Sequence, residues 1–537
     1  MGGIGGAVVV NGKAERAVAS KWLILTAMIF AVSMTFIDQT IVSIAVPDIQ
    51  EELSLTSTGV QWAVNAYLLA MASFFAFGGR IADTAGHRKM VVIGVVVFAG
   101  ASALCGLTPT GDLAQAWIVV FRAVQGLGGA LMFPAALAIV VQTFPLNERG
   151  KALAAFFGIA GGLTAVGPIL GGYLTQWTWR AIFWVNIPVA VIALILIVMS
   201  KPVTDFKRAP LDVRGLVLII GGVGLSVFGF QQAGDWGWGS PWVWLSVAAG
   251  LALMVVFFLV ELRTKEPLTQ VRIFGVRPFL VENIVLFLSM IAFIPIFFFA
   301  SEYAQISLGK EANEASLLLL YFFLGFVAAA QVGGRMLDSL GARRPVVIGS
   351  VVAAVGFYLW AEKVTDLDLG SQIWVIVLTG AGMGLMLGQA NTDAINRAGR
   401  LSYGEATGIT QTVRNYAASL GLAVLGTTVV HTWSHHLSNS LEAKGESASK
   451  ADALASSIAQ GGGVSSSGDS TSSIPMFVRV DFAQATRVVL LIMAATMLAS
   501  AVVALVGLRG GVQQDAADNA EAERPEGSAE GRQSSNR

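Results

Sequence analysis

Two ionisable side chains, Asp38 and Arg122, lie inside long apolar stretches of the sequence. A charge at such a depth in a membrane helix is costly, and it marks an ion or substrate pathway. Along helices that rise 1.5 Å per residue, Asp38 lies about 12 Å and Arg122 about 10 Å from the same end of their stretches. The two side chains can therefore meet, with Gln125 one helical turn beyond Arg122.

Burial and a neighbouring cation set the pKa of such a carboxylate, so a pair that forms and separates can take up and release a proton. We therefore interpret Asp38, Arg122 and Gln125 as a site for proton coupling and substrate binding. Asp38 could also face a cationic substrate, so that proton and substrate would compete for one carboxylate. The alternative is a buried ion pair with a purely structural role.

A third buried charge, Arg414, lies in the stretch Gln411-Thr412-Val413-Arg414-Asn415. No acid of the second half of the chain lies clearly at its depth, because Asp393 and Glu282 are nearer the predicted cytoplasmic face. Two interpretations stay open: a charge of the second half that takes part in coupling, and a structural cation that binds the carbonyls of a helix end.

One apolar stretch carries four glycines and a proline in a fixed order, namely Gly162, Gly167, Pro168, Gly171 and Gly172. Proline removes a backbone hydrogen bond and bends a helix. Glycines spaced three to five residues apart let another helix approach closely. We predict a bent, closely packed helix here, although a generic packing face would need the glycines too.

Residues 79–89 recur without a gap at residues 334–344. Each copy is a short charged turn between two apolar runs, which is typical of a loop between two membrane helices. The repeat predicts a protein of two related halves. We interpret the two loops as a cytoplasmic gate formed by Gly79, Asp83, Gly86, Arg88, Lys89, Asp338, Gly341 and Arg343.

The composition predicts an all-α integral membrane protein. Of 537 residues, 55% are hydrophobic and only 13% are charged, whereas soluble domains carry about 25% charged residues. A spanning helix needs about 20 apolar residues. Fourteen runs fit this length, at about 22–46, 60–79, 90–109, 115–141, 151–175, 180–200, 214–232, 241–262, 279–301, 315–337, 345–363, 371–396, 405–430 and 487–508.

Lys and Arg predict the orientation of these runs. With the N-terminus in the cytoplasm, 25 of the 34 Lys and Arg fall in cytoplasmic segments and 7 in outer ones. Cytoplasmic segments normally carry the excess of positive charge. We therefore expect a multi-pass protein of the bacterial cell membrane with both termini in the cytoplasm, which requires an even number of spans.

The distance between the repeated loops predicts the domain organisation. The first loop follows the second run and the second loop follows the tenth, so two runs are inserted between two six-helix bundles. We expect the bundles at residues 1–200 and 279–510, the inserted pair at 201–278, an extracellular loop at 431–485 and a disordered cytoplasmic tail at 511–537. The part of the loop at 434–475 is rich in Ser, Gly and Ala, so we expect it to be flexible, with one short helix around 440–460.

These motifs resemble those of a known family, the major facilitator superfamily. They are the loop Gly79-x-x-x-Asp83-x-x-Gly86-x-Arg88-Lys89, the string Arg122-x-x-Gln125-Gly126 and the antiporter motif Gly167-Pro168-x-x-Gly171-Gly172. The first run is similar to the acidic motif of the fourteen-span drug:proton antiporters, with Phe36-Ile37-Asp38-x-Thr40-x-Val42-x-x-Ala45-x-Pro47. Two positions depart from the family pattern: His87 replaces an Arg, and Gly388-Gln389-Ala390 lacks a proline.

The resemblance implies the major-facilitator fold and proton-driven export of lipophilic drugs or antibiotics. It also implies that Asp83 closes the cytoplasmic side against a neighbouring helix start, where carboxylates are favoured. Export of an endogenous lipid, siderophore or peptide is the alternative, and a non-transporting receptor or scaffold is a third reading. We expect no enzyme activity, cofactor, metal or nucleic acid; the partners are a small molecule, the proton and the bilayer.

Overall fold

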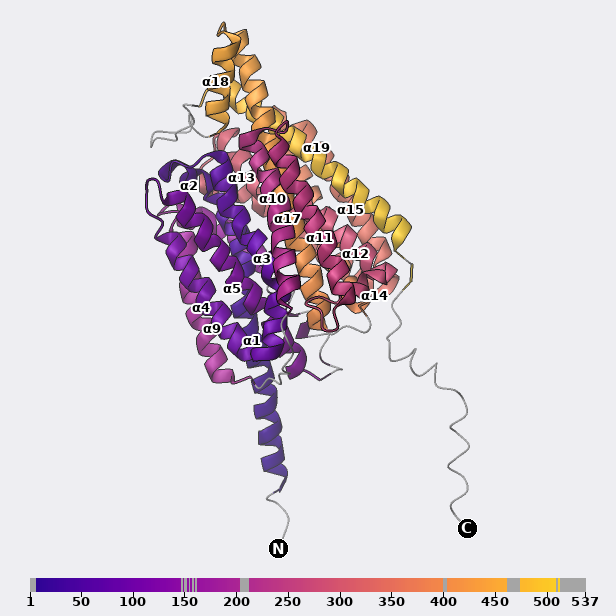
Figure 1. Cartoon of the computed structure of the whole chain (residues 1–537). Helices are drawn as coiled ribbons and strands as arrows, with labels where there is room; N and C mark the ends of the chain where they lie inside the picture. The colour runs from indigo at the N-terminus through magenta and orange to yellow at the C-terminus, as the bar shows by residue number, and fades with distance from the viewer. Residues whose placement is uncertain are drawn as a thin grey trace, which may run out of the picture.

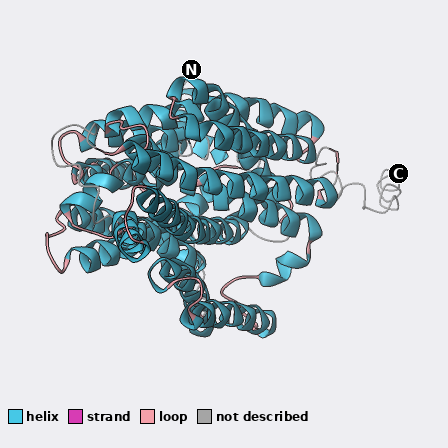
Figure 2. Cartoon of the chain, turned by 90° about the horizontal axis from the view of Figure 1, so that it is seen from above, coloured by secondary structure: helices cyan, strands magenta, loops and turns pink. Residues whose placement is uncertain are grey.

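Every regular element in the described part of the chain is a helix (Figures 1 and 2). The computed structural model describes residues 6–145, 162–202, 212–398, 403–460, 474–508 and 510–511, with residues 148, 152, 153, 155, 156 and 159. The α-helices are α1 Gly6–Ile44, α2 Val46–Glu52, α3 Ser57–Ala85, α4 His87–Gly106, α5 Ala114–Thr143, α7 Val166–Thr175, α8 Ala181–Trp184, α9 Asn186–Ser200, α10 Val213–Trp236, α11 Pro241–Arg263, α12 Arg277–Phe293, α13 Pro295–Ile306, α14 Ala312–Leu340, α15 Arg343–Lys363, α16 Leu369–Asn396, α17 Tyr403–Ala443, α18 Ala448–Ala459 and α19 Met476–Gly507. Three short 3-10 helices are η1 Leu163–Ala165, η2 Val271–Gly275 and η3 Val364–Asp366.

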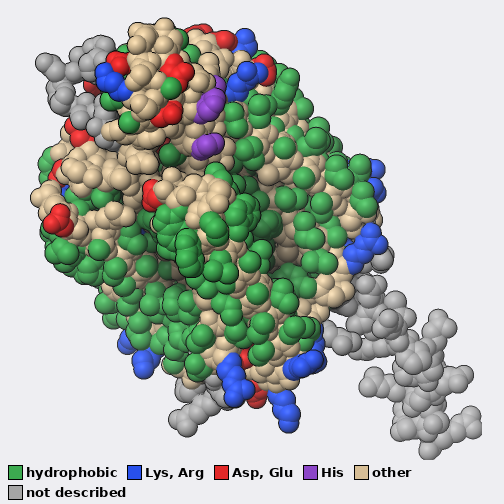
Figure 3. Space-filling view, turned by 45° about the horizontal axis from the view of Figure 1, so that its top comes forward, with side chains coloured by type: hydrophobic (Ala, Val, Ile, Leu, Met, Phe, Trp, Pro, Cys, Tyr) green, Lys and Arg blue, Asp and Glu red, His purple; other side chains and the backbone are tan. Residues whose placement is uncertain are grey.

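The all-α membrane class is confirmed. Twelve helical segments of the described residues are long and apolar enough to cross a membrane. Hydrophobic side chains form a broad belt on the face seen in Figure 3, and Lys and Arg gather along its lower edge. Such a belt suits the apolar interior of a bilayer, which a spanning helix must match over about 30 Å.

Two of the fourteen predicted runs are not among these twelve segments. The run at 151–175 includes residues outside the description, and the run at 405–430 lies in α17, a helix of 41 residues that carries Arg414 and many polar side chains. The count of fourteen spans therefore stays a prediction. The predicted break near residues 176–179 is present, because α7 ends at Thr175 and α8 begins at Ala181.

The two halves repeat a close contact between helices. A Cβ on Gly94 of α4 would lie 2.8 Å from the carbonyl oxygen of Gly128 in α5. A Cβ on Gly349 of α15 would lie 2.7 Å from that of Gly382 in α16. Only glycine permits backbones to approach so closely. The internal repeat seen in the loops therefore extends into the helix packing that positions them.

Helix α10 packs against α3 of the first half, α17 of the second half and its own partner α11. Its N-terminus is set by Asp212, whose side chain accepts a hydrogen bond from Gly215 N at 2.9 Å, as N-cap residues do. Figure 1 shows α10 and α11 beside α17 on the face toward the viewer. The position of α10 and α11 is consistent with an inserted pair at residues 201–278, and that assignment stays a prediction.

The expectation of an irregular loop at residues 431–485 is wrong for most of its described residues. Helix α17 continues to Ala443, α18 covers Ala448–Ala459 and α19 begins at Met476, so a helical hairpin projects from the upper end in Figure 1. Buried alanines of α18, such as Ala451 and Ala455, give the hairpin an apolar seam that composition alone did not reveal. The short helix near 440–460 is present; residues 461–473 and the predicted tail from 512 onward lie outside the described residues.

Candidate functional site

Asp38 of α1 and Arg122 of α5 form a buried ion pair. Arg122 Nη1 lies 2.5 Å from Asp38 Oδ2. The Asp38 side chain is 0% exposed and that of Arg122 is 1% exposed. The other carboxylate oxygen, Oδ1, accepts a hydrogen bond from Gln125 Nε2 at 2.8 Å. The structure thus brings together the three residues of the predicted coupling site, and it shields both carboxylate oxygens of Asp38 from water.

Arg122 is held by three further contacts. Its Nε donates to the carbonyl of Ala63 in α3 at 3.0 Å, and its Nη1 also donates to Gln125 Oε1 at 2.7 Å. Its guanidinium carbon lies 4.6 Å from the centre of the Tyr67 ring, a cation–π contact. Because these contacts come from α3 and α5, a shift of α1 would separate Asp38 from an Arg122 that stays in place.

A row of hydrogen-bonded polar side chains behind this pair escaped the sequence analysis. Ser102 Oγ of α4 accepts from Gln125 Nε2 at 3.2 Å and from Asn186 Nδ2 of α9 at 2.9 Å, and it donates to the carbonyl of Phe183 at 2.8 Å. Isolated polar residues inside apolar runs were the available signal. The row fixes the orientation of the Gln125 amide, and through it the carboxylate of Asp38.

The glycine–proline motif holds the helix that carries Asp38. Pro168 has no N–H, so the carbonyl of Thr164, four residues earlier, lacks its usual helical partner. Thr40 Oγ1 of α1 donates to that carbonyl at 2.9 Å. A 3-10 segment, η1, lies immediately before α7, and Pro168 lies in the first turn of α7; the bend at Pro168 stays a prediction.

The glycines of this motif divide between two neighbours. A Cβ on Gly167 or Gly171 would press on α1, at Thr40 and at the carbonyl of Ile41, whereas one on Gly172 would lie 2.9 Å from the Cα of Asn313 in α14. Gly162 has no atom within 4 Å of the position of a Cβ. Helix α7 therefore connects the Asp38 helix to the second half of the molecule.

The first repeated loop borders a cavity of about 480 Å³. Gly86 ends α3 with φ +99°, a backbone conformation that favours glycine. Asp83 Oδ1 lies 3.6 Å from Nε2 of the buried His87, the position where the family pattern has an Arg. Arg80 forms a 3.0 Å ion pair with Glu266, in the segment that follows α11. Arg88 is half-buried and Lys89 is exposed.

The second loop makes a different contact. Gly341 ends α14 with φ +76°, and Asp338 is exposed. Arg343 Nη2 donates to the carbonyl of Leu505 at 2.8 Å, at the last turn of α19. A cation at a helix C-terminus interacts favourably with the helix dipole. The two loops share a turn geometry but not their partners.

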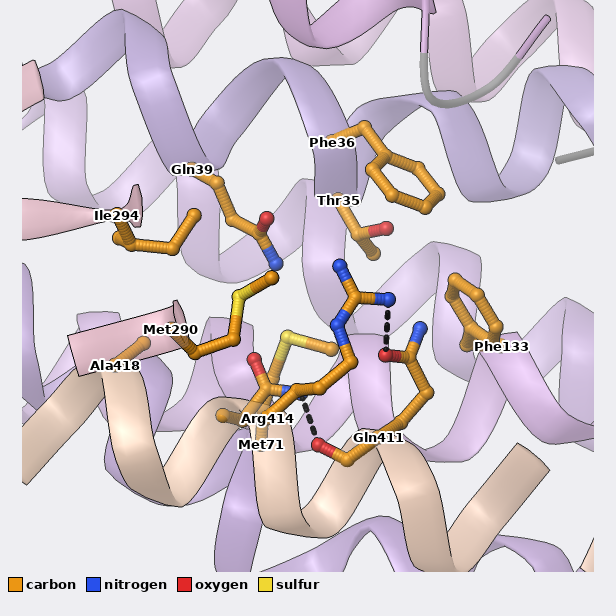
Figure 4. A pocket seen from close by; sticks show the side chains of 11 residues that line it. Thr35, Phe36, Gln39, Met71, Phe133, Met290, Ile294, Gln411, Arg414 and Ala418 are labelled. Carbon is orange, nitrogen blue, oxygen red and sulfur yellow. Dashed lines mark hydrogen bonds between the residues drawn. The ribbon is translucent and has the colours of Figure 1, made fainter. Parts of the chain in front are cut away.

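Arg414 lines a small cavity between the two halves (Figure 4). The cavity has a volume of about 20 Å³, with a wall from α1, α3 and α5 and a wall from α12 and α17. Arg414 Nη1 donates to Gln411 Oε1 at 2.9 Å. No carboxylate of the described residues forms an ion pair with Arg414, and its participation in coupling stays a prediction.

A second buried acidic group lies in the other half. Glu282 of α12 and Asp393 of α16 are 0% and 1% exposed, and Asp393 Oδ2 lies 2.6 Å from Arg397 Nε. The two carboxyl groups lie close enough to interact with each other. This group does not touch the cavity around Arg414.

Comparison with known proteins connects the fold to a family. Residues 28–422 match the family described as Major Facilitator Superfamily. The Tetracenomycin C resistance and export protein of Streptomyces glaucescens is 36% identical over 414 residues, 75% of each chain. The Cephamycin export protein CmcT of Amycolatopsis lactamdurans is 30% identical over 74% of this chain and 84% of its own. The Multidrug transporter protein MdtP of Bacillus subtilis is 28% identical over 76% of this chain and 75% of its own.

The solved structures agree on the fold. The xylose transporter XylE from E. coli, in a partially occluded inward open conformation, covers 92% of this chain and all of its own with a TM-score of 0.58. At 12% identity this likeness concerns the arrangement of helices alone.

Proposed function

The chain belongs to the Major Facilitator Superfamily and is a multi-pass membrane transporter, and we propose that it exports lipophilic drugs or antibiotics in exchange for protons. The observation that carries this proposal is the buried Asp38–Arg122 pair, whose carboxylate is fully enclosed in this conformation. Relatives named as exporters of tetracenomycin C and cephamycin support the substrate class.

The geometry supplies a coupling mechanism. Asp38 is on α1, whereas Arg122 is anchored to α3 and α5 by the Ala63 carbonyl, the Tyr67 ring and Gln125. In general, a neighbouring cation favours an ionised carboxylate, and burial without a cation favours the protonated acid. Alternating access can therefore bind a proton on one side of the membrane and release it on the other.

Two contacts connect this movement of α1 to the second half of the molecule. The Thr40–Thr164 hydrogen bond joins α1 to the 3-10 segment before α7, and Gly172 joins α7 to α14. A displacement of α14 would thus reach the Asp38 helix through α7. We further propose that the repeated loops close the cytoplasmic side, that the protein lies in the bacterial cell membrane and that both termini are cytoplasmic.

Transport by the purified full-length chain tests the proposal. In proteoliposomes with an imposed pH gradient, we expect a lipophilic substrate to move against its gradient, and we expect a proton ionophore to abolish the accumulation. Accumulation that depends neither on the pH gradient nor on the ionophore would contradict proton coupling. Proteoliposomes without protein provide the control for passive partitioning.

A further inference from the structure

We propose that the cavity between the halves binds a lipophilic acid. Its anionic group pairs with Arg414, and its apolar body lies against the rings of Phe36 and Phe133. This assignment rests on the proposed function, since it names the substrate class that the transporter carries. It differs from the earlier expectation that Asp38 could face a cationic substrate.

Charge balance around the cavity is the first argument. Arg414 is the one charged side chain among the described residues that line it. Asp38, the carboxylate of the predicted coupling site, has both oxygens engaged by Arg122 and Gln125 and is 0% exposed. The cavity is therefore electropositive, which attracts anions and repels cations.

The donors of Arg414 are the second argument. A guanidinium carries five N–H donors in a planar fork that matches a carboxylate. Nη1 donates to Gln411 Oε1, but Nε is buried and has no hydrogen-bond partner among the described residues. Arg414 is half-buried, and a cation withdrawn from water without an anion is costly, so a bound anionic group gains a pairing that the described residues do not supply.

The other side chains that line the cavity indicate the shape and polarity of the rest of the ligand. Figure 4 shows Phe36 and Phe133 on one side of Arg414, with Met71, Met290 and Ile294 around it. Aromatic rings offer flat apolar area, and methionine side chains adapt to irregular shapes. The Gln39 side chain reaches into the same space from α1, where its amide can bind a carbonyl or hydroxyl group. A polycyclic or aromatic acid fits this set better than a small hydrophilic anion.

The size of the cavity places this binding in another conformation. A volume of about 20 Å³ holds about one water molecule, so the ligand enters only when the halves separate. Arg414 is on α17, whereas Phe36 is on α1 and Phe133 on α5. A bound acid would therefore touch both halves, and its anionic group would not compete with the proton for Asp38.

Three probes of matched shape test the charge preference: anthracene-2-carboxylate, its methyl ester, and anthracen-2-ylmethylammonium. Their dissociation constants are measured at pH 7 by fluorescence titration of the purified full-length protein in detergent. We expect the acid to bind at least about tenfold more tightly than the ester, with the ammonium weakest, as one charge-assisted pairing suffices for this ratio. A protein that prefers the ester or the ammonium, or that binds none of the probes, overturns the assignment.

Substitutions locate the preference at Arg414. Arg414→Gln should weaken binding of the acid at least about tenfold and change binding of the ester less than about twofold. The control is Arg487→Gln, which removes an exposed Arg paired with Glu362; it should change the affinity for neither probe. Ester binding shows that the variant is folded. If Arg414→Gln binds no probe, Arg414→Lys decides, because lysine keeps the charge but cannot form two parallel bonds: the acid preference must fall, and an unchanged preference overturns the assignment.

A transport measurement separates this inference from the proposed function. If wild-type protein prefers the acid through Arg414 but moves none of the probes under a pH gradient, proton-driven export fails while the binding site stands. If a pH gradient drives the ester or the ammonium but the acid is not bound, export stands and the site assignment fails.

Discussion

At the residue scale, the hydrogen bond between Thr40 and the carbonyl of Thr164 compensates for the missing N–H of Pro168. Thr40→Val removes the donor and leaves a buried carbonyl unpaired, so we expect a loss of about 1–3 kcal/mol in unfolding free energy. Thermal or denaturant unfolding of the purified protein measures the loss.

A second substitution distinguishes this explanation from altered packing at residue 40. Pro168→Ala restores an N–H that can bond the Thr164 carbonyl within the helix. In that background Thr40→Val should cost clearly less. An equal cost in both backgrounds would show that the hydrogen bond is not responsible.

The carboxyl of Asp48, in α2 outside the spanning segments, provides a pH-dependent prediction. Burial, together with repulsion from Glu51 and Glu52, raises its pKa from 3.8 to about 6. A raised pKa in the folded state stabilises the fold fully below about pH 3.8, and this stabilisation is lost as the pH rises through about 6.

Asp48→Asn should therefore reduce the decline of stability between pH 4 and pH 7 by up to about 3 kcal/mol. The measurement is a series of unfolding midpoints across this range. Asp112→Asn, in an exposed loop, is the matched control and should follow the wild type. A variant with the same pH profile as the wild type would exclude a titration of Asp48.

At the scale of elements, α10 closes the seam between α3 and α17 by a buried polar ladder. Gln231 Oε1 accepts from Asn65 Nδ2 at 2.9 Å, and Gln231 Nε2 donates to Gln61 Oε1 at 3.0 Å. Asn65 in turn accepts a hydrogen bond from Ser419 of α17. Gln231 of the predicted inserted pair thus bonds directly to α3, and Asn65 continues the ladder from α3 to α17.

Gln231→Leu would leave the amides of Gln61 and Asn65 without these partners. We expect a loss of about 1–3 kcal/mol in stability, since all three side chains are buried. Gln232→Leu is the matched control: it removes only the acceptor of the partly exposed Trp62 and should cost less. Equal unfolding midpoints for the two variants would mean that the ladder does not stabilise the seam.

Sequence patterns predicted elements whose physical cause is local. Apolar length predicted twelve candidate spans that the structure contains, Gly86 and Gly341 indicated the turns, and the depth of two charges indicated that Asp38 and Arg122 could meet. Contacts that depend on tertiary packing were not predictable, such as Ser102 with Asn186 across two helices. The helical hairpin beyond residue 431 was missed because its Ser- and Ala-rich composition resembles that of a flexible loop.

At the scale of the molecule, the orientation in the membrane is testable because Cys105, the chain's one cysteine, is buried. In a Cys105→Ala background, we expect a membrane-impermeant maleimide to label Ser457→Cys on the exposed face of α18 in intact cells. Lys89→Cys in the first repeated loop should be labelled only after the membrane is broken. The reverse pattern would invert the predicted topology.

The central claim is that Asp38 exchanges the proton that drives export. Asp38→Asn keeps nearly the shape of the neutral acid, and its amide oxygen can still accept a hydrogen bond from Arg122, so the variant should fold. It cannot change its charge. Substrate movement down its own gradient should therefore persist, while pH-driven accumulation should fail.

The most direct measurement compares these two activities in the same proteoliposomes. For Asp38→Asn we predict counterflow exchange of the substrate close to that of the wild type, and accumulation under an imposed pH gradient no greater than in protein-free liposomes; Asp112→Asn should retain both. An Asp38→Asn protein that accumulates substrate at the wild-type rate with the wild-type pH dependence would contradict the account, and would move the coupling site to Glu282 and Asp393.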